Sequence, residues 1–98
     1  MQRRKLTTEE ITTLEKQGCI CSDWNNIDVA SDFIPLNIYN VYFSGKNVLG
    51  KFIKDVRLSG GVDLPSGIRN CLLHNCVIGD DVFISNVKKL SNYKIEND

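Results

Sequence analysis

The sequence predicts a mainly β fold: a β-solenoid, in which short strands coil and stack, preceded by a helical N-terminal cap. The main observation is an aliphatic residue at every sixth position, at Leu72, Ile78, Ile84 and Leu90. A helix repeats about every 3.6 residues and a strand about every two, so neither element alone gives a period of six. Such a period is typical of a solenoid whose strands each end at a corner.

Three consecutive six-residue units can be aligned over residues 72–89. Their first position, beginning with Leu72, is always aliphatic, as an inward-pointing layer requires. The fifth position is Cys76, then Val82, and finally Lys88, which breaks the pattern. Glycine, asparagine and aspartate tolerate the left-handed backbone of a tight turn, so we expect corners at Asn75, Gly79, Asp80 and Asn86.

A second repeat consists of Ile-x-Asn followed by Val or Cys, at residues 38–41, 68–71 and 84–87. Stacked coils would place the three asparagines near one another at a corner. The segment 95–98 also looks like the start of another unit of the kind at 78–81, seventeen residues later (78 to 95). A solenoid normally needs three or more repeats and a cap at each end, so we expect the chain to stop partway through a coil.

The clearest local signal is a short amphipathic helix within residues 6–18. Thr7 is a suitable N-cap, and Glu10, three residues later, completes a capping box. Leu6 and Ile11 occupy the positions of a hydrophobic staple around that cap, and a glycine at the end predicts the stop. We therefore expect a helix of about three turns, a usual length in globular proteins.

A brief helical turn is predicted at residues 22–25, capped by Ser22, with Trp24 as a core anchor. From Ile38 the composition turns to β-branched and aromatic residues, and residues 51–58 alternate loosely. Turn-forming clusters at 44–47, 59–61 and 64–67 separate these segments.

These patterns divide the chain into two parts. Residues 1–37 are interpreted as a helical N-terminal cap over the open end of the solenoid, and residues 38–98 as its start, truncated after a few coils. Covering that end would hide backbone groups and apolar side chains that otherwise invite edge-to-edge association.

The charge balance is neutral, with twelve basic and twelve acidic residues. It gives no general electrostatic reason to expect nucleic acid or an anionic membrane as a partner. Arg3, Arg4 and Lys5 are interpreted as a solvated terminus. Because the sequence has neither an apolar run of about 20 residues nor a signal peptide, a cytoplasmic location is expected.

The four cysteines are expected to be reduced thiols. The pairs Cys19/Cys21 and Cys71/Cys76 have C-x-C and C-x4-C spacings, which do not match the usual zinc pairs. We therefore predict no metal and no cofactor. A small metal-binding module that uses these cysteines and His74 remains an alternative, testable by elemental analysis of the purified protein.

The segment 78–84, with the sequence IGDDVFI, resembles the hexapeptide repeats of left-handed parallel β-helix proteins. These include bacterial acyltransferases and the tail domains of some sugar nucleotidyltransferases. On residues 4–11, 43–45 and 73–79, the whole chain also looks like the N-terminal region of a much longer, uncharacterised bacterial family of that kind. The resemblance implies a left-handed parallel β-helix and, by analogy, transferase chemistry.

His74 is the candidate catalytic residue that this resemblance implies. In β-helix acyltransferases a histidine at a coil edge acts as general base, and His74 is the one histidine of the sequence, at the third place of its unit. No acyl-donor site is recognisable beside it. The adjacent carboxylates Asp80 and Asp81 are expected to accept backbone hydrogen bonds at a corner, because neighbouring side chains on an extended segment point in opposite directions.

The leading functional hypothesis is structural: a capped start of a β-helix whose function lies in assembly or in later coils. The expected partner is another copy of the chain, which would form a homo-oligomer through exposed coil edges. The alternative is a fragment of an acyl- or nucleotidyltransferase-type enzyme, not active by itself.

Overall fold

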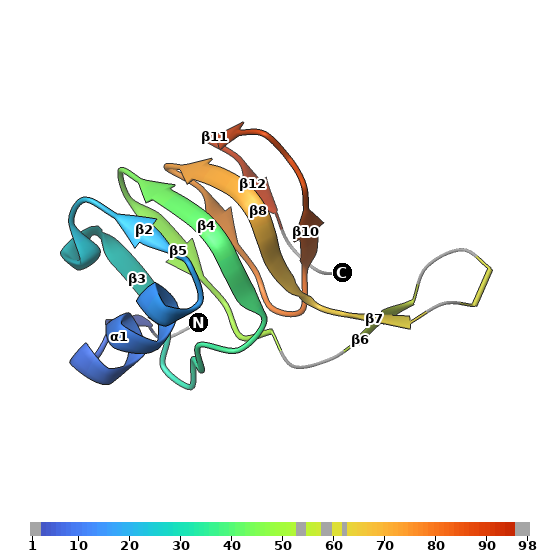
Figure 1. The fold of residues 1–98 in the computed structure, drawn as a ribbon, viewed down its shortest axis with the longest axis horizontal. Helices are drawn as coiled ribbons and strands as arrows, with labels where there is room; N and C mark the ends of the chain where they lie inside the picture. Colours follow the sequence, from blue (N-terminus) through green and yellow to red (C-terminus); the bar gives the residue numbers. More distant parts are fainter. Residues whose placement is uncertain (1–2, 53–54, 58–59, 62, 96–98) are drawn as a thin grey trace.

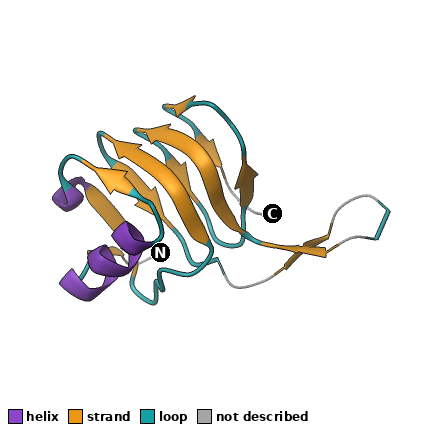
Figure 2. Ribbon diagram, in the orientation of Figure 1, coloured by secondary structure: helices purple, strands orange, loops and turns teal. Residues whose placement is uncertain are grey.

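The structure, a computed structural model, describes residues 3–52, 55–57, 60–61 and 63–95. It is mainly β, as the sequence predicts. Strands of two sheets contribute side chains to one shared core, and the helical segments lie together at one end of the sheets (Figure 2). No helix within the described ranges is long and apolar enough to cross a membrane.

The predicted N-terminal helix is confirmed as α1 (Thr8–Lys16), preceded by a short strand, β1 (Arg3–Lys5). Thr7 is the N-cap, and the reciprocal bonds of the capping box with Glu10 are both present. Leu14 is fully buried, so the helix packs onto the end of the core. Gly18 follows with a φ of +86°, as a helix stop requires.

The predicted second turn is also confirmed, between two short strands: β2 (Ile20–Cys21), η1 (Trp24–Asn26) and β3 (Ile27–Ala30). Its N-cap, however, is Asp23 and not Ser22, because the Asp23 side chain accepts a hydrogen bond from the backbone N–H of Asn25 at 3.0 Å. Trp24 is partly buried, and its ring lies 5.9 Å from that of Phe43.

Seven further strands continue the two sheets: β4 (Ile38–Ser44), β5 (Asn47–Leu49), β8 (Gly67–His74), β9 (Val77–Ile78), β10 (Phe83–Ser85), β11 (Leu90–Ser91) and β12 (Lys94–Ile95). One sheet has the order β1-β3-β5-β9-β12, and the other β10-β8-β4-β2, with β11 also paired to β8 (Figure 1). Every described pair in these two sheets is parallel except β1 with β3. The prediction that β structure starts at Ile38 is wrong, since β2 and β3 already belong to the sheets; strands of two and four residues carry too little pattern to be recognised.

A hairpin made of β6 (Asp55–Arg57) and β7 (Asp63–Pro65) interrupts this arrangement between β5 and β8. Its strands are antiparallel, and Figure 1 shows it projecting away from both sheets. Of the alternation predicted for residues 51–58, Phe52 is confirmed as fully buried. The other predicted positions on that face lie outside the described side chains.

The strand register stacks equivalent residues in rows. Ile38 pairs with Ile68 thirty residues later (38 to 68), and Ile68 pairs with Ile84 sixteen residues later (68 to 84). The first interval is longer because it contains the hairpin. Ile78 pairs with Ile95 seventeen residues later (78 to 95), so the predicted echo at residue 95 is confirmed, while residues 96–98 lie outside the described part.

One inward position was predicted wrongly. Leu72 is only partly buried, whereas its neighbour Leu73 is fully buried and lies in the core with Ile78 and Ile84. The cause is the length of the corner between the two strands. Five positions separate Leu73 from Ile78 (73 to 78), and six separate Ile78 from Ile84 (78 to 84), so a strict period of six counted backwards lands one residue too early.

The other positions expected inside are borne out. Cys76 is fully buried and Val82 is 8% exposed, while Lys88 is exposed. Leu90 is partly buried and packs against the core.

Candidate functional site

Residues with a left-handed backbone lie next to one another in the stacked strands. The three asparagines of the Ile-x-Asn repeat, Asn40, Asn70 and Asn86, have φ values of 54°, 54° and 58°. Asn40 Nδ2 donates to Asn70 Oδ1 at 3.2 Å, and Asn70 Nδ2 donates to Asn86 Oδ1 at 2.9 Å. The prediction that these asparagines lie together is therefore confirmed. We call Asn40, Asn70 and Asn86 the asparagine column.

Gly18 lies at the start of this column. A Cβ at Gly18 would stand 2.2 Å from Asn40 Oδ1, so the carboxamide of Asn40 occupies the space that a side chain would need. The backbone φ of +86° also favours glycine. Only glycine satisfies both conditions without displacing the column.

The candidate His74 belongs to a second group of this kind. Its strand register places Ser44, His74 and Ser91 in one row, at the ends of β4, β8 and β11. The next residues, Gly45, Asn75 and Asn92, have φ values of 68°, 54° and 62°. The corner predicted at Asn75 is therefore confirmed, and it holds His74 beside Ser44.

Both ring nitrogens of His74 have a partner. Nδ1 lies 3.0 Å from Ser44 Oγ, and Nε2 lies 3.0 Å from Asn75 Nδ2. The Asn75 amide cannot be turned over, because its Oδ1 accepts a hydrogen bond from the backbone N–H of Lys46 at 2.9 Å. Nε2 therefore faces a donor and must accept, which leaves the proton on Nδ1, donated to Ser44.

This tautomer decides what the site can do chemically. A serine nucleophile needs a base whose lone pair faces its hydroxyl proton. In the network described, the His74 nitrogen that faces Ser44 carries the proton, and the lone pair of the other nitrogen is already engaged by Asn75. The arrangement links two neighbouring strands by side-chain hydrogen bonds, and it does not activate Ser44.

The carboxylate of Asp80 does what was expected at a corner. Its Oδ1 accepts a hydrogen bond from the backbone N–H of Lys51 at 2.8 Å, and it lies over Gly50, where a Cβ would approach it to 2.4 Å. Asp81, not Asp80, has the left-handed backbone, with a φ of 53°. The described residues include no group of three or more His, Cys, Asp or Glu side chains that could hold a metal ion.

Three of the four thiols are buried, and all four are free of disulfides. Burial raises the pKa of the Cys19 and Cys21 thiols, and burial with the neighbouring Cys76 and Cys19 raises the pKa of Cys71 to about 11. Thiols with raised pKa values stay protonated at neutral pH, and a protonated thiol is a poor nucleophile and metal ligand. These residues act in the core as small apolar side chains.

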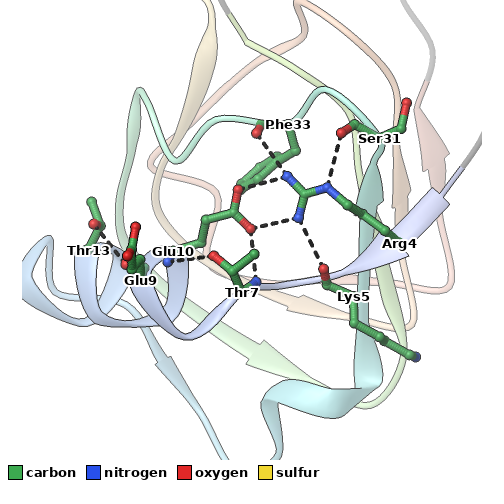
Figure 3. Close-up of polar contacts among 8 residues, drawn as sticks. All are labelled: Arg4, Lys5, Thr7, Glu9, Glu10, Thr13, Ser31 and Phe33. Carbon is green, nitrogen blue, oxygen red and sulfur yellow. Dashed lines mark hydrogen bonds and ion pairs between the residues drawn. The ribbon is translucent and has the colours of Figure 1, made fainter.

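The basic N-terminal cluster is more than a solvated terminus, because Arg4 is anchored in the fold (Figure 3). Its two terminal nitrogens each donate to one oxygen of Glu10 at 2.8 Å. The remaining donors reach the backbone oxygens of Ser31, Lys5 and Phe33, so all five N–H groups have partners. The hydrogen bonds from Arg4 hold the pKa of Glu10 below its ordinary value.

Asn47 is a residue that the sequence reasoning missed. It is 1% exposed, and its amide donates to the backbone oxygens of Ser44 and Leu73 at 3.0 and 3.4 Å. Its Oδ1 accepts from the backbone N–H of Cys76 at 2.9 Å. Asn47 thus provides hydrogen-bond partners for backbone groups at a place where the corner after β8 is one residue shorter than the corner after β4. A single asparagine in a turn gives no signal of this role in the sequence.

Comparison with protein families shows that the chain belongs to the family described as a domain of unknown function, DUF4954, whose model matches residues 3–98. The chain is also 30% identical over 94 residues to an uncharacterized protein of Treponema pallidum (strain Nichols). That match covers 96% of this chain but only 13% of the relative. No solved structure matches the chain significantly.

Proposed function

We propose that the chain is the capped start of a left-handed parallel β-helix and that its role is structural. One end of the stacked strands is closed, and the other serves for assembly. The observation that carries this proposal is the row formed by residues 38, 68 and 84, which lies beside the asparagine column. Where no hairpin intervenes, paired residues are sixteen or seventeen positions apart, which is the spacing expected for successive coils. The resemblance of segment 78–84 to hexapeptide repeats supports the left-handed form.

The closed end is built from α1 and β1. Leu14 of α1 is fully buried against the core, and Arg4 of β1 is tied to Glu10 of α1 by two hydrogen bonds. β1 is short, antiparallel and wholly basic, which are devices that protect a sheet edge from pairing with another chain. In this proposal β1 therefore stops the stack in its own sheet, while β2, the edge strand of the other sheet, pairs only with β4.

The test is nuclear magnetic resonance of the intact chain in solution. Parallel stacking requires backbone NOEs between residues sixteen or seventeen apart, such as Ile68 with Ile84 and Ile78 with Ile95. Amide exchange should be slowest in β4 and β8, which each have a neighbour on both sides, and faster in β10 and β12. Absence of these NOEs in a folded sample would overturn the proposal.

A transferase role for His74 is the second candidate, favoured by its 3.0 Å contact with Ser44. It ranks below the structural role because the proton lies on the nitrogen that faces Ser44. If acyl or nucleotidyl transfer is detected, His74→Ala should abolish turnover and leave the circular dichroism spectrum unchanged. Turnover that survives this substitution would remove His74 as the base.

A further inference from the structure

The last strands of the stack have an open side. β10 and β11 pair only with β8, and β12 pairs only with β9, among the described strands. The core residues of this last layer are less buried than the residues that they pair with in the preceding layer. Leu73 and Ile78 are fully buried, whereas Leu90 and Ile95, which pair with them, are only partly buried. Open backbone edges beside partly exposed aliphatic side chains form a surface that fits another strand.

The asparagine column has a direction that points to this surface. Each amide donates through Nδ2 to the Oδ1 of the asparagine in the following layer. Asn86 is the last member and is exposed, and no described residue accepts from its Nδ2. The matching group in an occupant is therefore a side-chain oxygen, from Asn or Asp, on a left-handed backbone.

The charge of this surface distinguishes between two possible occupants, a second copy of the chain and a strand segment of different charge. Lys88 and Lys89 are exposed between β10 and β11, and the residues 82–95 contain three lysines and no acidic residue. A second copy that docked through this same layer would place like charges together, which is unfavourable. In head-to-tail docking, the edge of β3 in the next copy is already paired with β1, so only the edge strand β2 could accept strands from the open end. An acidic strand segment is the complementary partner.

We propose that this open end, defined by β10, β11, β12 and Asn86, binds one more coil of the same repeat. The occupant carries Asn or Asp opposite Asn86 and acidic side chains opposite Lys88 and Lys89. Its source is the polypeptide of longer family members, since the matched region takes up only 13% of the Treponema relative. This inference rests on the proposed β-helix and names the partner of its open end.

The probe is a fluorescein-labelled peptide with the sequence of residues 79–95, in which the two lysines at positions 88 and 89 are replaced by glutamate. It is titrated into the intact chain and followed by fluorescence anisotropy. We expect saturable binding that weakens as salt is raised, because the opposed charges are exposed. The peptide that keeps both lysines should bind at least about tenfold more weakly, given repulsion in place of attraction.

Three variants of the chain make the test specific. Asn86→Gly keeps the left-handed backbone, removes the terminal amide and should weaken binding about three- to tenfold, as loss of one hydrogen bond predicts. Asn40→Gly removes an amide from the opposite end of the same column and should leave the affinity unchanged. Charge reversal at Lys88 and Lys89 in the chain should invert the preference, so that the lysine peptide now binds more tightly.

The inference fails if a folded chain shows no saturable binding, or if both peptides bind alike and Asn86→Gly has no effect. It also fails if sedimentation shows a dimer that Lys88→Glu or Leu90→Ser dissociates, because the occupant would then be a second copy. These outcomes leave the proposed β-helix standing when the NOEs between rows persist. Loss of those NOEs would overturn the proposed function itself.

Discussion

Replacing Asn70 tests the asparagine column at its centre. Asn70 accepts a hydrogen bond from Asn40 and donates one to Asn86, and its backbone has a φ of 54°. Asn70→Gly removes both side-chain bonds and keeps a residue that adopts this backbone freely. Asn70→Ala removes the same bonds and adds the left-handed strain of a Cβ. The pair therefore separates the amide contacts from the backbone requirement.

The expected losses of stability follow from the two hydrogen bonds and from the backbone strain. A neutral hydrogen bond stabilises by about 0.5–1.5 kcal/mol net, and the exposed position of Asn70 favours the lower half, so Asn70→Gly should cost about 1–2 kcal/mol. Asn70→Ala should cost about 1 kcal/mol more, because L-residues are strained at positive φ. For a domain of this size about 1 kcal/mol corresponds to about 4–8 °C in Tm.

The assay is thermal and urea unfolding followed by circular dichroism, with a double-mutant cycle as its control. Asn40→Gly shares a hydrogen bond with Asn70→Gly, so the pair should show a coupling of about 0.5–1 kcal/mol. Asn75→Gly lies in the other group of left-handed residues, and its effect should add to that of Asn70→Gly. The reasoning is refuted if Asn70→Ala and Asn70→Gly are both as stable as the natural chain, or if the Asn40 cycle shows no coupling.

Three further predictions concern the closed end, the corner glycines and the thiols. The pKa of Glu10 is held below its ordinary value of 4.5, so the stabilisation by its carboxylate is fully present above that pH and is lost as the pH falls through the lower folded pKa. Glu10→Gln should therefore cost about 1–3 kcal/mol at pH 7 and much less at pH 3, measured by thermal unfolding at both pH values. The control Glu9→Gln, at an exposed position, should change the stability little. Gly45→Ala should destabilise the chain by about 1–3 kcal/mol more than Gly60→Ala in urea unfolding. Both glycines have positive φ, but only at Gly45 would a Cβ meet a neighbouring atom, Asn75 Oδ1 at 2.1 Å. Equal losses of stability would contradict the proposed clash. Because the pKa of Cys71 is raised to about 11, iodoacetamide at pH 8 should label it only after denaturation, as measured by mass spectrometry, and rapid labelling of the native chain would show that this thiol is accessible.

Much of the corner structure could be predicted from the sequence, because left-handed residues are drawn from a small set. Asparagines at the same place in three copies of Ile-x-Asn predicted one corner, and the structure brings Asn40, Asn70 and Asn86 into hydrogen-bond contact. The capping box of Thr7 and Glu10 was equally readable, since it depends on residues only three positions apart. Local chemistry with a fixed spacing leaves a clear trace in a single sequence.

Other features could not be predicted, because they depend on contacts across layers. The inward face of β8 is set by the number of residues in the corner at Asn75, so Leu73 and not Leu72 enters the core. Asn47 is buried because backbone groups of Leu73 and Cys76 in the neighbouring layer need partners, and the residues next to Asn47 in the chain give no sign of that need. The tautomer of His74 depends likewise on Lys46, whose N–H fixes the Asn75 amide from the turn between β4 and β5, 29 residues earlier in the chain.

The two ends of the stacked strands differ in how far their apolar core residues are buried. At one end the apolar core is covered by Leu14, and the edge strand is held by the bonds of Arg4 to Glu10. At the other end, Leu90 and Ile95 are only partly buried, and the strands beside them are edge strands, as β1 and β2 are at the first end. The proposed function makes the end that Leu14 covers a boundary of the stack and the end at Leu90 and Ile95 a junction. On the proposed function, the residues that set the register of that junction, Asn86 above all, matter more than the candidate His74, whose two nitrogens are already engaged within the fold.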